Sequence, residues 1–192
     1  MQNKNIYEIV FKGRGGQGIV TLAQLTAEAL FECGFNDIKV IPTYGAERRG
    51  APVETNLKCS NNNIYELTPS NKLDYIVFLD SSLFKEEEII KRIKEDYYII
   101  VNTDSELEYK NLAGEKIIKI DITGIALKNK LLLHNRPIIN TPILGAFSEV
   151  SGLFTITEIK KVIEKNFKKD EIEINLRTIE EVISEVKNVF KK

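Results

Sequence analysis

Gly13-Arg14-Gly15-Gly16-Gln17-Gly18 is the stretch that decides the fold of this chain. It follows an apolar run at residues 6–11 that predicts a first strand, and it opens residues 19–31, whose apolar spacing predicts a helix. A strand, a glycine turn and a helix in this order bring backbone N–H groups and a helix N-terminus to one point. The sequence therefore predicts a turn that can hold an anion such as a phosphate.

The glycine stretch satisfies the pattern G-x-G-x-x-G, which also occurs in dinucleotide-binding folds. A dinucleotide site further needs an acidic residue at the end of the second strand. The second predicted strand, residues 38–41, instead continues into Pro42-Thr43-Tyr44 and carries no such carboxylate. A nicotinamide or flavin site is therefore disfavoured.

A short loop rich in charge and glycine follows the second predicted strand, at residues 44–52. Its side chains and the glycine stretch form the candidate site, which serves either a ligand or a subunit interface. The candidate residues are Gly13, Arg14, Gly15, Gly16, Gln17, Gly18, Tyr44, Glu47, Arg48, Arg49 and Gly50.

Strand patterns continue through the middle of the chain. Residues 53–59 alternate between apolar and polar side chains, and residues 64–67 are expected to return as a hairpin strand. Residues 75–79 are apolar on both faces, which is typical of a central parallel strand. Further strands are predicted at residues 97–101 and 116–120, and Ser81 or Ser82 is expected to cap a helix with an acidic first turn at residues 86–88.

From residue 123 the chain is expected to be mostly helical. Apolar faces at helical spacing run through residues 125–132, 143–150 and 178–190, and Thr157 is expected to cap a helix over residues 158–169. No repeat or linker interrupts the pattern. We expect a single domain, residues 1–192, of the α/β class, with a mainly parallel Rossmann-like sheet flanked by helices and a helical C-terminal part.

The composition excludes several classes of function. With 43% hydrophobic and 29% charged residues among 192, the chain is predicted to be globular, with one full core. A net charge of −1 provides no field that would attract nucleic acid. No signal peptide or membrane-spanning run is evident, so we expect a cytoplasmic protein that has no membrane partner.

The cysteines and the single histidine do not suggest a catalytic or metal site. Cys33 and Cys59 are far apart and supply fewer thiolates than an iron–sulfur cluster needs, so both are expected to be buried or half-buried apolar residues. His134, at the end of a helical pattern, is expected to be a helix-end cation or a surface residue. We therefore predict no catalytic residue and no metal ligand in this chain.

Three stretches together resemble the gamma subunit of 2-oxoacid:ferredoxin oxidoreductases. The likeness is greatest to the pyruvate-oxidising members, the pyruvate synthases. This finer distinction depends mainly on Arg14 and on the amino-acid sequence of residues 47–52. The three stretches occur in order over nearly the full length. They are Lys12-Gly13-Arg14-Gly15-Gly16-Gln17-Gly18, Tyr44-Gly45-Ala46-Glu47-Arg48-Arg49-Gly50-Ala51-Pro52-Val53 and Asn135-Arg136-Pro137-Ile138-Ile139-Asn140-Thr141-Pro142-Ile143-Leu144-Gly145-Ala146-Phe147.

The resemblance implies a reaction that several subunits share. In such complexes thiamine diphosphate and its Mg²⁺ serve decarboxylation, iron–sulfur clusters pass electrons to ferredoxin, and coenzyme A accepts the acyl group. The resemblance assigns thiamine diphosphate, Mg²⁺ and the iron–sulfur clusters to partner subunits of the alpha, beta and delta types, with no cofactor bound by the gamma chain alone and with coenzyme A possible at the interface. The chain is then part of an enzyme without being catalytic by itself.

The sequence leaves open what the two loops do. In one interpretation the glycine stretch, with Arg14, Arg48 or Arg49, receives part of coenzyme A at the subunit interface. In the other the loops only dock on the catalytic subunits, with Glu47 paired to an arginine and Tyr44 as an interface anchor. A third hypothesis, from another functional class, is a free-standing nucleotide-binding or regulatory module without catalytic partners.

Overall fold

A mixed β-sheet with helices on both faces forms the centre of the molecule. The computed structural model describes residues 6–43 and 50–190, and within them the main sheet has six strands in the order β2-β3-β1-β4-β5-β6. The strands are β1 (Tyr7–Arg14), β2 (Asp37–Thr43), β3 (Pro52–Ser60), β4 (Leu73–Phe78), β5 (Ile93–Asn102) and β6 (Ile117–Ile120).

The sheet is mainly parallel, as the sequence predicts. β1 pairs in parallel with β4, β4 with β5, and β5 with β6. β3 is antiparallel to both of its neighbours, β1 and β2, so it alone runs against the other strands of this sheet. The carboxyl ends of the parallel strands therefore meet at one edge, where open α/β sheets bind their ligands.

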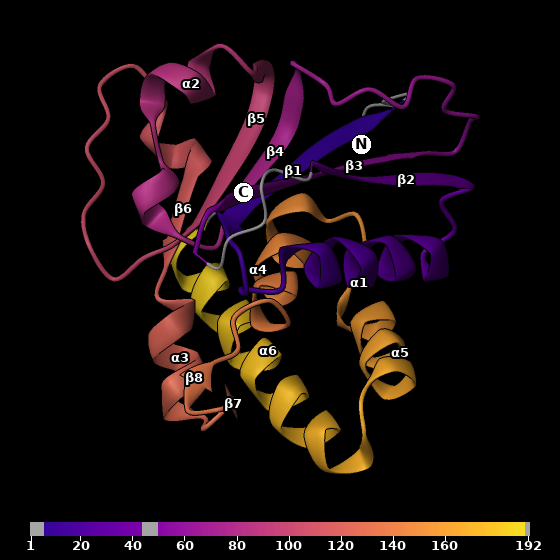
Figure 1. Ribbon diagram of the computed structural model, residues 1–192, viewed down its shortest axis with the longest axis vertical. Helices are drawn as coiled ribbons and strands as arrows, with labels where there is room; N and C mark the ends of the chain where they lie inside the picture. The colour runs from indigo at the N-terminus through magenta and orange to yellow at the C-terminus, as the bar shows by residue number, and fades with distance from the viewer. Residues whose placement is uncertain (1–5, 44–49, 191–192) are drawn as a thin grey trace.

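Helices cover the two faces unequally. Figure 1 shows α1, α4, α5 and α6 gathered on one side of the sheet, and α2 lies on the other. The helices are α1 (Ile19–Glu32), α2 (Glu86–Ile90), α3 (Ile122–Lys128), α4 (Pro142–Ser151), α5 (Ile156–Asn166) and α6 (Lys169–Val189), with short 3₁₀ turns at Ser81–Leu83 and Gly114–Lys116. A small hairpin, β7 (Leu132–Leu133) and β8 (Arg136–Pro137), follows α3.

The core has one apolar cluster on each face of the sheet. Successive side chains of a strand point to opposite faces, so Ile9 and Phe11 join the larger cluster under the helices while Val10 joins the smaller one. Every residue of β4 is buried, as expected for a central strand with apolar side chains on both faces. Phe147 of α4 packs edge-on against Phe11 and Tyr75 and so fixes α4 to the centre of the sheet.

Some predicted elements have other boundaries. Residues 64–67 form no strand: Ile64 is buried in a loop, but Tyr65 is exposed. The segment after β4 begins with a 3₁₀ turn capped by Asp80, whose side chain accepts a hydrogen bond from the backbone N–H of Ser82, and α2 starts only at Glu86. The predicted serine cap is therefore wrong, although the acidic first turn of α2 is confirmed.

The C-terminal helices also differ in detail. α5 is capped by Thr155, not Thr157, through a reciprocal capping box with Glu158. α6 already begins at Lys169, so it is longer than the predicted helix at residues 178–190. Helix α3 ends at Lys128, so the predicted apolar face is interrupted: Leu131 is buried in the segment that follows and Leu132 begins the β7–β8 hairpin.

Three single-residue expectations can be compared with the structure. Cys59 is buried as predicted, but Cys33 is exposed because it follows the last turn of α1 at the surface. His134 is exposed, as one alternative stated, and lies in the β7–β8 turn rather than at a helix end. Among the described residues, no helix combines the length and apolar character that crossing a bilayer requires.

Candidate functional site

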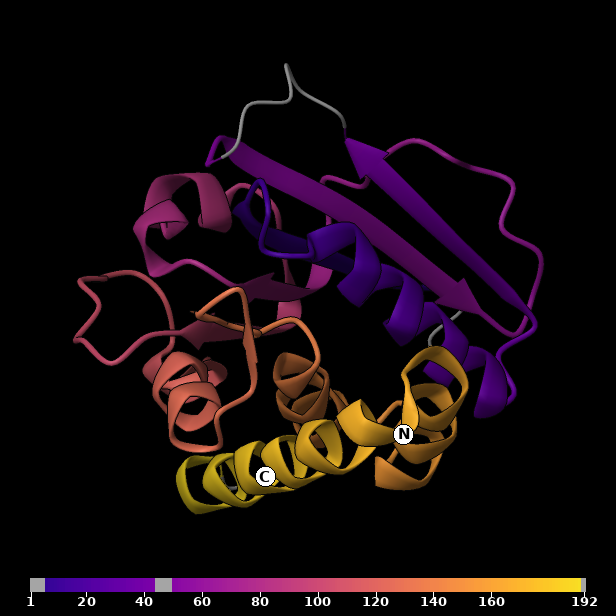
Figure 2. The same cartoon turned by 60° about the horizontal axis from the view of Figure 1, so that its bottom comes forward.

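The glycine loop, residues 13–18, lies at the carboxyl edge of the sheet. β1 ends at Arg14, the chain turns through three glycines and Gln17, and α1 begins at Ile19. Figure 2 shows this indigo turn leading into α1 beside the magenta segment that follows β4. The predicted order of strand, glycine turn and helix is therefore confirmed.

Backbone conformation explains the glycines of this loop. Gly16 has φ 94° and Gly18 has φ 72°, values in the left-handed region that other residues rarely adopt. The Gln17 side chain closes the turn, since its Oε1 accepts a 2.7 Å hydrogen bond from the backbone N–H of Arg14. The Gln17 backbone N–H donates in turn to the Arg14 carbonyl at 3.0 Å. The loop is thus held in one compact form by its own residues.

Backbone hydrogen bonds also join the glycine loop to the two residues that precede β3. The backbone N–H of Gly15 donates to the carbonyl of Ala51 at 2.8 Å, and that of Gly50 donates to the carbonyl of Gly15 at 3.2 Å. Gly50, a predicted member of the site, is therefore in direct contact with the glycine stretch. The other predicted members of that second loop, Tyr44, Glu47, Arg48 and Arg49, lie outside the described residues.

Arg14 makes three hydrogen bonds from its guanidinium group. Nε donates to Asp80 Oδ2 at 2.8 Å, Nη1 to the Gly50 carbonyl at 3.0 Å, and Nη2 to Ser82 Oγ at 2.8 Å. Burial opposes ionisation of Asp80, but the hydrogen bonds from Ser82 and Arg14 outweigh it and lower the pKa of that carboxyl group. Arg14 is therefore an ion-paired connection between the end of β1, the turn before β3 and the segment after β4.

Close packing limits two of the glycines. A Cβ atom on Gly13 would lie 2.6 Å from Gln17 Oε1 and 2.8 Å from Ile19 Cδ1. A Cβ atom on Gly18 would lie 2.5 Å from Asn140 Nδ2. Gly16 differs, because a Cβ atom there would meet no described atom within 4 Å. The described residues thus leave the space beside Gly16 open.

Asn140 joins the third sequence motif to the glycine loop. It precedes Thr141, the N-cap of α4, so the N-termini of α1 and α4 lie side by side at this edge. Thr141 is buried and its Oγ1 donates to Asn175 Oδ1 of α6 at 2.5 Å. Two helix N-termini at one place favour negative charge there.

Several donors in this region have no described partner. Within residues 6–43 and 50–190, the backbone N–H groups of Gly16 and Gly18 make no hydrogen bond. They lie next to the first turn of α1, whose N–H groups also point away from the helix. The arrangement can bind an anionic oxygen through backbone donors.

Sequence reasoning missed three residues of this site. Asp80 and Ser82 follow β4, and their position at the carboxyl end of a parallel neighbour of β1 was the available signal. Asn140 lies in the third of the stretches that carry the family resemblance, residues 135–147, but it is 122 positions from Gly18 along the chain. Only the folded chain brings them together.

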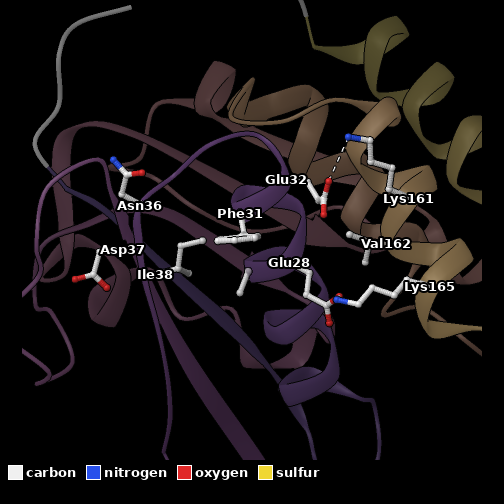
Figure 3. Close-up of a pocket in the computed structure, with 10 residues that line it drawn as sticks. Glu28, Phe31, Glu32, Asn36, Asp37, Ile38, Lys161, Val162 and Lys165 are labelled. Carbon is white, nitrogen blue, oxygen red and sulfur yellow. Dashed lines mark hydrogen bonds and ion pairs between the residues drawn. The ribbon is translucent and has the colours of Figure 1, made fainter.

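A groove of about 410 Å³ lies at the opposite end of α1, away from the glycine loop. Figure 3 shows Phe31 and Ile38 inside it, with acidic side chains of α1 facing lysines of α5. Glu28 pairs with Lys165 at 3.0 Å, and Glu32 pairs with Lys161 at 3.2 Å. These ion pairs connect α1 and α5, so the charged side chains of the groove have a structural role.

No metal-binding arrangement is present in the described part of the chain. In that part, no group of three or more His, Cys, Asp or Glu side chains is placed to hold a metal ion. The glycine loop with Arg14, Asp80, Gly50 and Asn140 is the candidate binding or docking site, built from backbone donors and an ion pair.

Comparisons with known proteins agree on one family. Residues 8–185 match the family model described as pyruvate ferredoxin/flavodoxin oxidoreductase. The chain is 41% identical over 160 residues to the pyruvate synthase subunit PorC of Methanothermobacter marburgensis, an alignment that covers 83% of this chain and 86% of that one. It is 36% identical over 178 residues to the common gamma subunit of the pyruvate/ketoisovalerate oxidoreductases of Pyrococcus furiosus, covering 91% and 94% of the two chains.

A solved structure gives the same result. The crystal structure of the pyruvate oxidoreductase subunit PORC of Thermotoga maritima superimposes with a TM-score of 0.77 at 31% identity, covering 94% of this chain and 97% of that one. The chain therefore belongs to the pyruvate ferredoxin/flavodoxin oxidoreductase family, as a gamma subunit of a multi-subunit 2-oxoacid:ferredoxin oxidoreductase.

Proposed function

We propose that this gamma subunit works in a pyruvate-oxidising complex and that its glycine loop contacts coenzyme A where the chain meets a larger subunit. The single observation that carries the proposal is the pair of backbone N–H groups at Gly16 and Gly18, which have no described partner and lie beside the N-terminus of α1. Backbone donors of this kind suit the pyrophosphate of coenzyme A.

Pyruvate is the substrate that the relatives' names support. The Methanothermobacter relative is a pyruvate synthase subunit, and the Pyrococcus relative serves both pyruvate and ketoisovalerate oxidoreductases. We propose the same pyruvate chemistry for the complex of this chain, in the cytoplasm.

The redox and decarboxylation centres are proposed to belong to alpha, beta and delta-type partners, with ferredoxin as the electron acceptor of the whole complex. Thiamine diphosphate with Mg²⁺ would supply the carbanion chemistry there, and iron–sulfur clusters would carry the electrons. The described residues of this chain offer no cluster of metal ligands, which is compatible with that division. The task of this chain is then to bind and orient part of the acyl acceptor and to hold the subunits together.

Docking alone is the second candidate function of the loop. It is favoured by the ion pair between Arg14 and Asp80, which partly neutralises the charge of Arg14. Tyr44, Glu47, Arg48 and Arg49, from the second loop at residues 44–52, are proposed as ligand or interface residues of the same site. Family membership argues against a third alternative, the free-standing nucleotide-binding module.

A matched pair of glycine variants tests the proposal in the reconstituted complex. Gly16 and Gly34 have φ 94° and 99°, and neither has a described atom within 4 Å of its Cβ position, so both substitutions strain the backbone alike. They lie at opposite ends of α1, roughly 20 Å apart along the helix. Gly16→Val should raise the KM for coenzyme A by about tenfold or more, and Gly34→Val should not.

Assembly is measured on the same samples by size-exclusion chromatography. A Gly16→Val complex that assembles but needs more coenzyme A supports ligand contact, whereas a complex that no longer assembles supports the docking function instead. If Gly16→Val and Gly34→Val behave alike in both measurements, the loop has neither role.

A further inference from the structure

The register of the sheet brings Arg14 and Asp80 together. β1 and β4 are parallel, with Lys12 opposite Phe78, so the residues two places further on are also neighbours. Their side chains meet at the carboxyl edge, and Arg14 Nε donates to Asp80 Oδ2 at 2.8 Å. The pair is therefore a direct product of the strand order and lies next to the glycine loop.

The Asp80 carboxylate is itself held in place. Its Oδ1 accepts hydrogen bonds from both the backbone N–H and the hydroxyl group of Ser82, and its Oδ2 is left for Arg14. The Asp80 side chain is 22% exposed; burial opposes its ionisation, but these hydrogen bonds lower the pKa of the carboxyl group. Asp80 is thus a fixed negative charge with one oxygen assigned to each neighbour.

This arrangement orients Arg14 but does not engage all of its N–H donors. Its hydrogen bonds to Asp80, Gly50 and Ser82 engage Nε and one hydrogen each on Nη1 and Nη2. Each terminal nitrogen therefore keeps a second N–H donor, for which the described residues contain no partner. The side chain is 37% exposed, so these donors can be reached from outside.

We infer that Asp80 is a positioning residue, which fixes the Arg14 guanidinium so that its remaining donors bind a phosphate of coenzyme A together with the backbone N–H groups of the glycine loop. The inference rests on the proposed function and adds to it the Asp80 carboxylate, which orients Arg14 before the ligand binds. A guanidinium held in one orientation matches two phosphate oxygens at once, and it loses little side-chain freedom on binding.

The test uses four variants of the complete complex and the dependence of its activity on coenzyme A. Arg14→Gln removes the binding group, and we expect the KM for coenzyme A to rise about 10- to 100-fold. Asp80→Ala keeps Arg14 but removes the carboxylate that orients it, and we expect the KM for coenzyme A to rise about tenfold. Asp80→Asn retains an acceptor oxygen and should return the KM to within about threefold of the parent value. In all three, kcat at saturating coenzyme A should stay close to that of the parent.

Glu181→Gln is the matched control. Glu181 is 25% exposed, pairs with Lys128 and accepts a second hydrogen bond from Asn129, so it resembles Asp80 in burial and in the number of partners. It belongs to α6 and has no contact with the glycine loop. We expect an unchanged KM for coenzyme A in this variant.

The outcomes separate this inference from the proposed function. If Arg14→Gln raises the KM but Asp80→Ala leaves it unchanged, or if Asp80→Asn fails to recover it, Asp80 has no positioning role. If Asp80→Ala prevents assembly in size-exclusion chromatography while Glu181→Gln does not, the pair serves a subunit interface and the inference is wrong. If Gly16→Val and Arg14→Gln both leave the KM unchanged, the proposed contact with coenzyme A fails as well.

Discussion

At the scale of single residues, the glycine loop depends on two different physical requirements. Within the described part of the chain, Gly16 is required only for its backbone angle, whereas Gly18 is required both for its angle and for the space that Asn140 occupies beside it. The sequence predicts the first requirement, because a glycine turn between a strand and a helix is a local pattern. It does not predict the second, because Asn140 reaches Gly18 only in the folded chain.

Replacing Gly18 should therefore cost more stability than its backbone angle explains. Gly34→Ala introduces a side chain at φ 99° into open space and should destabilise the chain by about 1–2 kcal/mol, the cost of the left-handed region. Gly18→Ala adds a collision with Asn140 Nδ2 and should cost about 1 kcal/mol more. Thermal denaturation of the two variants measures the difference. Equal losses would mean that Asn140 moves aside freely.

Arg14 shows how far residue-level prediction reaches. In one of the two interpretations that the sequence leaves open, Arg14, Arg48 or Arg49 receives part of coenzyme A together with the glycine stretch. The structure pairs Arg14 with Asp80, and that pairing follows from β1 and β4 being neighbours, which no local pattern specifies. The sequence could therefore single out Arg14 as a candidate residue, but it could not identify Asp80 as the partner of Arg14.

At the scale of secondary structure, strands were predicted better than helix ends. The apolar runs that became β1, β4 and β5 are distinctive because consecutive residues, which point to opposite faces, are buried: all of β4, residues 9–11 of β1 and residues 99–102 of β5. α6 was predicted too short because its first turns carry polar residues such as Asp170 and Glu173, and its apolar spacing becomes regular only later. The single reversed strand, β3, follows β2 after a connection shorter than the crossover that a parallel pair requires.

A partly buried ion pair joins β3 to the segment that precedes β5, and it should make the free energy of unfolding depend on pH. Arg92, which precedes β5, donates to both carboxylate oxygens of Glu54 on β3 at 2.7 and 2.8 Å. Burial alone would raise the pKa of Glu54, but the hydrogen bonds and charge of Arg92, with Lys12 nearby, lower it. Because the folded-state pKa is depressed, the stabilisation is present at neutral pH and is lost as the pH falls through that pKa.

Glu54→Gln should therefore lower the free energy of unfolding by roughly 1–2 kcal/mol at neutral pH. The difference from the parent should shrink as the pH falls below the ordinary carboxyl range, where the parent also loses the charge. Urea denaturation at a series of pH values measures it. A difference that stays constant down to acid pH would show that the charge of Glu54 contributes nothing.

At the scale of the whole molecule, the fold concentrates the proposed binding groups at the carboxyl edge of the sheet. The three sequence motifs that indicated the family are far apart along the chain, yet Gly18 meets Asn140 and Gly15 meets Gly50 in the structure. The family and the fold class were predictable from these motifs, and both are confirmed. The assignment of residues 1–192 to one domain stays a prediction.

The central claim is that this chain is a gamma subunit whose activity exists only within its complex. The most direct measurement is pyruvate- and coenzyme-A-dependent reduction of ferredoxin or a redox dye, made on the purified chain alone and on the chain copurified with its native partners, with iron determined in both samples. We predict no activity and no iron in the chain alone, and both in the copurified complex. Activity or bound iron in the chain without partners would contradict the account.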